Sequence, residues 1–382
     1  MYIILVNLAK FISWFINFLK LGSGYTWPGH IVLKLNPHIL GQVVNKLPNT
    51  VILVSGTNGK TTTVKLLSHL LDSNKKKVLA NKSGANLLNG VVSTILLSSN
   101  IKGELPYDYA VFELDELVLP KVLKYIKPRA IILLNLSRDQ LDRHWEVDLV
   151  FSRWVNAFKE LEAKHTIVVD ASLEGIEKLR VLGFSDFITF DSSNDYLSDS
   201  SLEGKFNAKN INAVMKTLVN IGYEEESLRN YLNNFSPAYG RGEKISHGGK
   251  LWQVFLAKNP ASLNQNLQLI IEKEERVDTL LFALNDDVPD GHDVSWIYDI
   301  NPDLIKRATQ EKKIYISGKR ALDMAIRLSY AGVSLDEKNI DSNLKQIVNT
   351  IDEDERVEKI VSLPNYSAML ELRKIIKGRS IL

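Results

Sequence analysis

The segment Gly56–Thr62 reads GTNGKTT and has the composition of a loop that binds phosphate. Backbone N–H groups of a glycine-rich turn can point at phosphate oxygens, and a helix that starts there adds its positive end. Lys60 could reach the outer phosphates of ATP, and the Thr61 hydroxyl could bind Mg²⁺. The general P-loop pattern has a further Gly at the position of Val54, so the segment is either a chance match or a shortened subclass. The candidate nucleotide-binding residues of the loop are Gly56, Thr57, Asn58, Gly59, Lys60, Thr61 and Thr62.

Two polar segments follow apolar runs further along the chain. Glu113 lies in FELDE (112–116) and is a candidate Mg²⁺ ligand, with a solvated acidic strand end as the alternative. The segment NLSRDQLDR (135–143) offers Asn135, Asp139 and Arg143 as substrate contacts, with the capped start of a helix as the alternative. Ligands bind at the carboxyl edge of parallel sheets, so we expect these segments to converge there.

The elements that must position these residues alternate between strand and helix patterns. Short β-branched runs lie at 51–55, 76–80, 109–114, 130–136 and 166–170, and a second series lies at 251–256, 279–285, 313–318 and 359–364. This alternation predicts an α/β protein: a central P-loop domain with a mostly parallel sheet, and a smaller C-terminal Rossmann-like α/β domain. SPAYGRGEK (236–244) is a turn-rich hinge candidate. We therefore expect an N-terminal helical and loop segment packed on the central domain (1–48), the central domain (49–240) and the C-terminal domain (241–382).

Composition excludes several classes of function. The chain has 382 residues with 47 Lys and Arg against 45 Asp and Glu, so bulk charge does not favour nucleic-acid binding. It has no Cys, which rules out disulfides, thiolate zinc sites and a cysteine nucleophile. The seven His are scattered, and no zinc is expected.

Residues 1–20 are apolar but interrupted by Lys10, and Asn7, Lys10, Ser13 and Asn17 recur at helical spacing. This pattern favours an amphipathic helix docked on the protein. Peripheral contact with a membrane surface, or a signal or anchor, are the alternatives. We interpret the chain as a cytoplasmic protein. Within the cytoplasm, a location at the inner face of the cell membrane is the alternative.

The three motifs together resemble the Mur ligase family, whose form of the phosphate loop is GTNGKTT. Further segments resemble its MurT-like branch, which belongs to lipid II isoglutaminyl synthase. They include NKSGANLLNG (81–90), LAKNPASLNQ (256–265), ALNDDVPDGHDVSWIYD (283–299) and LPNYSAMLELR (363–373). The resemblance implies an ATP-dependent carbon–nitrogen ligase that amidates the D-glutamate α-carboxylate of the lipid II stem peptide through an acyl phosphate, with Lys60 and Glu113 as catalytic residues. The alternative is another Mur-type or folylpolyglutamate-like ligase that adds an amino acid.

The resemblance also implies roles outside the loop. Arg241 matches the family's G-R-x-E, and Asn207 and Asn210 match its nucleotide-side helix, where a helix cap is the alternative. Ammonia would come from a GatD-like glutaminase subunit in a heterodimer, and Asp293 would complete that partner's Cys–His pair, unless it only caps a turn. Asp286, Asp287, Asp290 and His292 are near competitors.

Two departures accompany the resemblance. The four-Cys zinc ribbon of well-studied members shrinks here to residues 191–204, without Cys. Gln140 and Val155 stand where amino-acid-adding members have the His of D-H-L-D and a carbamylated Lys, which fits the amidating branch.

Overall fold

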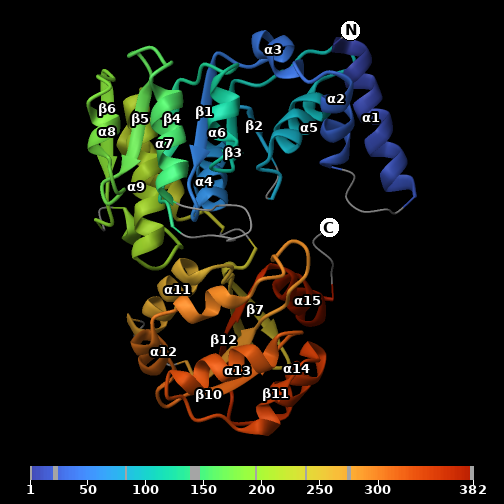
Figure 1. The fold of residues 1–382 in the computed structure, drawn as a ribbon, viewed down its shortest axis with the longest axis vertical. Coiled ribbons are helices and arrows are strands. Elements are labelled where there is room, and N and C mark those ends of the chain that lie inside the picture. Colours follow the sequence, from blue (N-terminus) through green and yellow to red (C-terminus); the bar gives the residue numbers. More distant parts are fainter. Residues whose placement is uncertain are drawn as a thin grey trace. The chain divides into compact units, whose positions relative to one another are not determined.

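The computed structural model describes residues 2–19, 25–81, 84–137, 147–193, 196–236, 239–272 and 277–378. The chain divides into two compact units, which Figure 1 shows in sequence colours. The described residues of the first unit lie within 1–136 and 147–236, and those of the second lie within 237–381. In the described residues no helix is both long enough and apolar enough to cross a lipid bilayer.

The first unit is built on a six-stranded parallel sheet in the order β2-β3-β1-β4-β5-β6. Central strand β1 pairs with β3 on one side and β4 on the other, which brings the ends of all three strands to the same edge. The bounds are β1 (Thr50–Ser55), β2 (Val78–Ala80), β3 (Tyr109–Leu114), β4 (Ala130–Leu133), β5 (Thr166–Asp170) and β6 (Asp186–Phe190).

Helices cover both faces of this sheet, which explains why its strands are continuous apolar runs. Along β1, Ile52 and Val54 pack in one core and Val51 and Leu53 in the other. The first core holds α4 (Lys60–Ser73), α9 (Lys205–Asn220) and α10 (Glu225–Leu232). The second holds α5 (Leu88–Ser98), α6 (Leu119–Leu123), α7 (Val147–Phe158) and α8 (Glu177–Arg180). The short 3-10 turn η2 (Leu197–Asp199) precedes α9.

The N-terminal helices join the second core. Helix α1 (Tyr2–Phe18) buries Leu5, Val6 and Ala9, and it is followed by α2 (Trp27–Leu35), α3 (Ile39–Val43) and the 3-10 turn η1 (Val44–Lys46). Asn7 and Asn17 are exposed, as their spacing predicted. The outer face is nevertheless mainly aromatic, because Phe11, Trp14, Phe15 and Phe18 are also exposed.

The second unit has its own six-stranded sheet, in the order β11-β10-β9-β12-β8-β7. Its strands are β7 (Arg241–His247), β8 (Lys250–Phe255), β9 (Thr279–Ala283), β10 (Lys313–Ser317), β11 (Ile340–Asp341) and β12 (Lys359–Pro364). The sheet is parallel except at the β7–β8 hairpin. Its helices are α11 (Pro260–Glu272), α12 (Pro302–Thr309), α13 (Ala321–Tyr330), α14 (Leu344–Glu353) and α15 (Tyr366–Lys377), with 3-10 turns η3 (Ser295–Asp299) and η4 (Glu337–Asn339).

These two sheets confirm the predicted α/β fold class. One expectation is wrong in part: residues 241–244 of the hinge candidate form the start of strand β7 rather than a turn. These residues join the sheet because the chain turns at Gly248 and Gly249 and β8 then pairs antiparallel with β7. In this pairing Glu243 lies opposite Val254.

Candidate functional site

The phosphate-loop candidate connects β1 to α4 at the carboxyl edge of the first sheet. Gly56 and Gly59 both have positive φ, 135° and 90°, a conformation that L side chains rarely adopt. A Cβ on Gly59 would lie 2.4 Å from the Oδ1 of Asn210, so the position has no room for a side chain. The loop is therefore a fixed turn whose last glycine lies against α9. This glycine is also the N-cap of α4, at the positive end of the helix dipole.

Asn135, which follows β4, holds this loop in place. Its backbone oxygen accepts the N–H of Thr57 at 2.7 Å. Its side-chain Oδ1 accepts from the N–H of Asn58 at 3.1 Å, and its Nδ2 donates to the oxygen of Asn58 at 3.0 Å. These contacts show that Asn135 shapes the loop, and the substrate contact expected from sequence stays a prediction. Asp139 and Arg143, the other two expected substrate contacts, lie outside the described residues.

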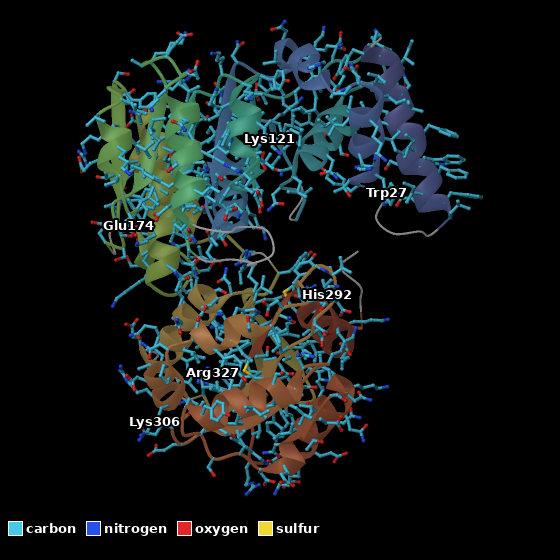
Figure 2. All side chains as sticks on the ribbon, in the orientation of Figure 1. Trp27, Lys121, Glu174, His292, Lys306 and Arg327 are labelled. Atoms are coloured by element: carbon cyan, nitrogen blue, oxygen red, sulfur yellow. The ribbon has the colours of Figure 1, made fainter. Side chains whose placement is uncertain are left out.

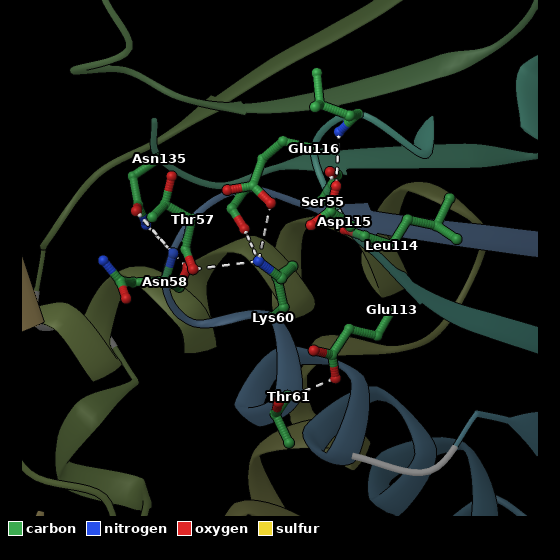
Figure 3. A network of polar contacts seen from close by, with 12 residues as sticks. Ser55, Thr57, Asn58, Lys60, Thr61, Glu113, Leu114, Asp115, Glu116 and Asn135 are labelled. Carbon is green, nitrogen blue, oxygen red and sulfur yellow. Dashed lines mark hydrogen bonds and ion pairs between the residues drawn. The ribbon is translucent and has the colours of Figure 1, made fainter. Parts of the chain in front are cut away.

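Lys60 lies at the centre of the polar network in Figure 3, and its side chain is buried. Its Nζ donates to the backbone oxygens of Gly56 and, at 3.2 Å, of Thr57. It also pairs with the Oε2 of Glu116 at 3.2 Å. The backbone oxygen of Glu116 in turn accepts the indole N–H of Trp154 at 2.8 Å, so a fully buried aromatic side chain anchors the turn that carries the carboxylate.

Thr61 and Glu113 form a second contact next to Lys60 (Figure 3). The hydroxyl of Thr61 donates to the Oε2 of Glu113 at 3.0 Å, and Glu113 is buried. Asn81 fixes the backbone at this strand end, because its Oδ1 accepts from the N–H of Glu113 at 2.7 Å and its Nδ2 donates to the oxygen of Glu113 at 2.8 Å. Two oxygen ligands on adjacent elements suit Mg²⁺, which typically takes one or two protein oxygens and completes its shell with water and phosphate.

Asn207 and Asn210 lie on α9 and are buried. Asn207 donates to the backbone oxygen of Glu203 at 2.8 Å, and Asn210 donates to the Oδ1 of Asn207 at 3.4 Å. Asn210 is thus brought against the loop at Gly59, while the amide nitrogen of Asn207 is engaged at the start of its own helix. Thr62 is buried in the first turn of α4.

In the second unit, Arg241 begins β7 and Glu243 follows on the same strand. Glu243 forms a bidentate ion pair with Arg373 of α15, at 2.8 and 2.9 Å, and a further bond of 2.7 Å to Lys377. Burial would raise the pKa of Glu243, but the hydrogen bonds from Arg373 and Lys377 outweigh it and leave the pKa below its ordinary value. The acidic residue of the G-R-x-E segment therefore ties the hairpin to α15.

The acidic residues in the segment around Asp293 differ in their contacts. Asp287 pairs with Lys319, which lowers the pKa of the Asp287 carboxyl. Asp290 is half-buried and accepts the N–H of Tyr366 at 2.7 Å at the start of α15, and desolvation raises its pKa despite these bonds. Asp293 is exposed, and its carboxylate accepts the N–H of Ser295 at 2.8 Å.

The contact with Ser295 lowers the pKa of Asp293, so its carboxylate is ionised at neutral pH. Asp286 lies 4.0 Å from Arg320, and His292 is exposed. Asp293 is thus an exposed carboxylate set beside a short 3-10 turn, whereas Asp287 and Asp290 are committed to contacts within the unit.

Two residues near the loop were missed by the sequence reasoning. Glu116 pairs with Lys60 through a turn after β3, and no local sequence pattern marks that turn. Asn81 was noticed only within a longer segment, although an Asn immediately after strand β2 was a usable signal for an edge residue.

Comparisons with known proteins give two family matches and two groups of relatives. The Mur ligase middle-domain family matches residues 54–213, and the MurT ligase C-terminal family matches residues 256–369. The subunit MurT of lipid II isoglutaminyl synthase (glutamine-hydrolyzing) from Staphylococcus aureus strain COL is 26% identical, over 91% of both chains. The protein of the same name from Streptococcus pneumoniae R6 is 24% identical, over 95% of this chain and 94% of the relative.

Solved structures show the same fold. MurF from Acinetobacter baumannii superposes with a TM-score of 0.68 at 18% identity, over 88% of this chain and 78% of that chain. Folylpolyglutamate synthase from Mycobacterium tuberculosis, solved with ADP, superposes with a TM-score of 0.65 at 14% identity, over 90% and 93% of the two chains.

A loop of this form on a parallel sheet, with a carboxylate at the neighbouring strand end, is typical of a nucleotide-binding site. Together the two family matches and the relatives named MurT show a MurT-like Mur ligase and an ATP-dependent ligase. The similarity of the chain extends through the C-terminal family as well as the middle one, and covers nearly the whole chain of the named relatives. Within the Mur ligases it is MurT-like.

Proposed function

We propose that this chain amidates the α-carboxylate of the D-glutamate in the lipid II stem peptide, in peptidoglycan synthesis, with ATP as the energy source and ammonia as the nitrogen donor. The observation that carries the proposal is that buried Lys60 and Glu113 lie with half-buried Thr61 at one edge of the sheet, in a chain similar along its length to MurT subunits. Those subunits are named for lipid II isoglutaminyl synthase, and the MurT ligase C-terminal family matches residues 256–369 of the second unit.

Amide formation from a carboxylate is uphill, so the carboxylate must first be activated. In the proposed reaction a carboxylate oxygen attacks the γ-phosphorus of ATP, and ADP leaves with the bridging oxygen. Ammonia then attacks the carbonyl carbon of the acyl phosphate, phosphate leaves, and the amide loses a proton to water. Both steps depend mainly on positioning and on neutralising phosphate charge.

Lys60 is the residue suited to that neutralisation. It stands in the first turn of α4, and its ammonium lies among oxygens of the loop. In the bound state it would exchange some of these contacts for phosphate oxygens, while the loop N–H groups and the start of α4 bind the same anion. Thr61 and Glu113 would hold Mg²⁺, which supplies further charge neutralisation when bound. Arg241, Asn207 and Asn210 would contribute on the nucleotide side, and Asp139 and Arg143 on the substrate side.

When glutamine is the nitrogen donor, another protein must release the ammonia from it. The sequence has no Cys, so it has no thiolate with which to hydrolyse glutamine. We propose a GatD-like glutaminase as the partner subunit, with Asp293 orienting the imidazole of the partner's Cys–His pair. An exposed carboxylate with a lowered pKa is suited to that role, because it remains charged at neutral pH.

The test is a reconstitution with the glutaminase partner, glutamine, ATP, Mg²⁺ and lipid II, read by mass spectrometry of the stem peptide. The expected product has a hydroxyl replaced by an amino group and is accompanied by one ADP per amide. Lys60→Ala should abolish the reaction, and Lys75→Ala, on an exposed turn after α4, should not. A product heavier by a whole amino acid would support the alternative, a ligase that adds an amino acid, and would contradict amidation.

A further inference from the structure

The N-terminal helix carries apolar side chains on two opposite faces. Leu5, Val6 and Ala9 are buried against the body of the first unit. The opposite side presents an aromatic face, by which we mean Ile4, Phe11, Trp14, Phe15 and Phe18. Their spacing places them on one stripe of the helix. Trp14 is 58% exposed and Phe18 is 69% exposed, values that are unusual for large apolar side chains in a water-facing helix.

The aromatic face is continuous. The rings of Phe11 and Trp14 lie 5.8 Å apart, those of Phe11 and Phe15 lie 6.1 Å apart, and those of Trp14 and Phe18 lie 5.6 Å apart. The exposed Trp27, labelled in Figure 2, stands at the first residue of α2, which packs against α1. A patch of this composition is typical of a binding surface.

Charge indicates what kind of surface would cover it. The whole chain is nearly balanced, but residues 1–50 contain four Lys and no Asp or Glu. The helices packed against α1 are α2 and α5, and neither contains an acidic residue. Lys34 and Lys46 are exposed, and Lys10 reaches from α1 to the backbone oxygen of Leu97 at 2.9 Å. The N-terminal segment that carries the aromatic face therefore has a net positive charge as well as exposed apolar side chains.

From these observations we propose that the aromatic face of α1 docks on the surface of an anionic lipid bilayer. A helix that lies in the interface buries its apolar face at the boundary between headgroups and acyl chains, and nearby Lys side chains attract anionic headgroups. Aromatic side chains are the ones enriched at that depth. The inward face of α1 is already occupied by the first unit, so docking would need no rearrangement of the fold.

This proposal is independent of the ligase reaction, and its test contains no lipid II. The full chain is mixed with vesicles of phosphatidylglycerol and phosphatidylcholine, or of phosphatidylcholine alone, and sedimented. We expect binding to the anionic vesicles, with little binding to the neutral ones. The double variant F11S/F18S should bind the anionic vesicles at least about tenfold more weakly, because two rings lose their place in the interface.

The matched control is L322S/Y330S, which removes two apolar side chains from α13 that are 71% and 76% exposed in the second unit. It should bind vesicles like the parent chain, and both double variants should unfold at the parent temperature. Equal binding to both vesicle types, equal losses in the two variants, or no binding at all would overturn the proposal. A concentration-dependent dimer that F11S/F18S abolishes would also overturn it, in favour of a second copy as the occupant.

Discussion

Lys60 and Glu116 form a buried ion pair, with their Nζ and Oε2 atoms 3.2 Å apart. The ammonium that should contact phosphate is thus already neutralised by a carboxylate of the protein. A bound triphosphate would compete with Glu116 for Lys60, and the two anions would repel each other. We therefore expect the pair to stabilise the loop in the absence of nucleotide and to weaken the first contact with ATP.

Replacing Glu116 by Gln should separate these two effects. The nucleotide-free chain should lose about 1–3 kcal/mol of stability, because a buried Lys60 loses its counter-charge but keeps a hydrogen-bond acceptor. ATP should bind at least about threefold more tightly, since it no longer displaces a carboxylate. Urea unfolding and titration calorimetry measure the two quantities.

The matched control is Asp354→Asn, which removes the partner of Lys313 in the second unit. It should lower stability without changing the affinity for ATP. Weaker ATP binding in Glu116→Gln would contradict this interpretation and would assign Glu116 to the nucleotide-bound state.

Gly59→Ala should remove nucleotide binding. The added Cβ meets the Oδ1 of Asn210 at 2.4 Å, and φ is 90° at this position, so the loop must distort. Backbone strain of this kind costs about 1–3 kcal/mol. Gly222→Ala is the control, because Gly222 has φ of 104° but no atom within 4 Å of its Cβ position. Thermal unfolding with and without ATP should show a destabilised chain in both cases, with the ATP-induced stabilisation lost only in Gly59→Ala.

The fold class could be predicted because strand runs and helix stripes are local patterns. The phosphate loop could be recognised for the same reason, since its glycines and Lys60 are contiguous. Contacts between residues far apart in the sequence could not be predicted in this way. Asn135 bonds to a residue 77 positions away in the loop, and Lys60 pairs with a residue 56 positions away. Single-sequence patterns carry no information on such pairs.

Two other features of the structure differ from the sequence-based expectation, and their origin in the sequence can be identified. The pair Gly248–Gly249, with positive φ at both residues, is the signature of a tight hairpin and would have placed residues 241–247 in a strand. Helix α1 has apolar residues on both faces, so periodicity alone does not tell which of them packs inward. The buried face turned out to be the one with small and aliphatic residues, which fit closely against neighbouring helices.

Glu243→Gln should make stability less dependent on acid pH. The pKa of Glu243 is lowered in the folded chain from its ordinary value of 4.5, so its ion pairs stabilise the fold above that value. This contribution is lost as pH falls through the lowered pKa. At pH 7 the variant should be less stable by about 2–3 kcal/mol, because Arg373 is left buried without its partner.

The measurement is urea unfolding of the second-unit transition at a series of pH values from 7 down into the acid range. The difference between parent and variant should shrink below pH 4.5 and vanish once Glu243 is protonated. Glu358→Gln, at an exposed position, is the control and should follow the parent throughout. A difference that stays constant with pH would mean that the loss comes from packing rather than from charge.

Asp293→Asn tests the proposed contact with a glutaminase. The substitution keeps the size and the acceptor for the Ser295 N–H but removes the negative charge, so the fold of the second unit should be unchanged. If Asp293 orients the partner's imidazole, glutamine-dependent amidation should fall by at least about a hundredfold, as expected for the loss of a triad carboxylate. Amidation with ammonium chloride should be unaffected, because that reaction bypasses the glutaminase. Asp287→Asn, which loses an ion pair to Lys319 nearby, should retain both activities. Equal losses with glutamine and with ammonia in Asp293→Asn would place Asp293 in the ligase reaction or in the fold, and would remove it from the partner's active site.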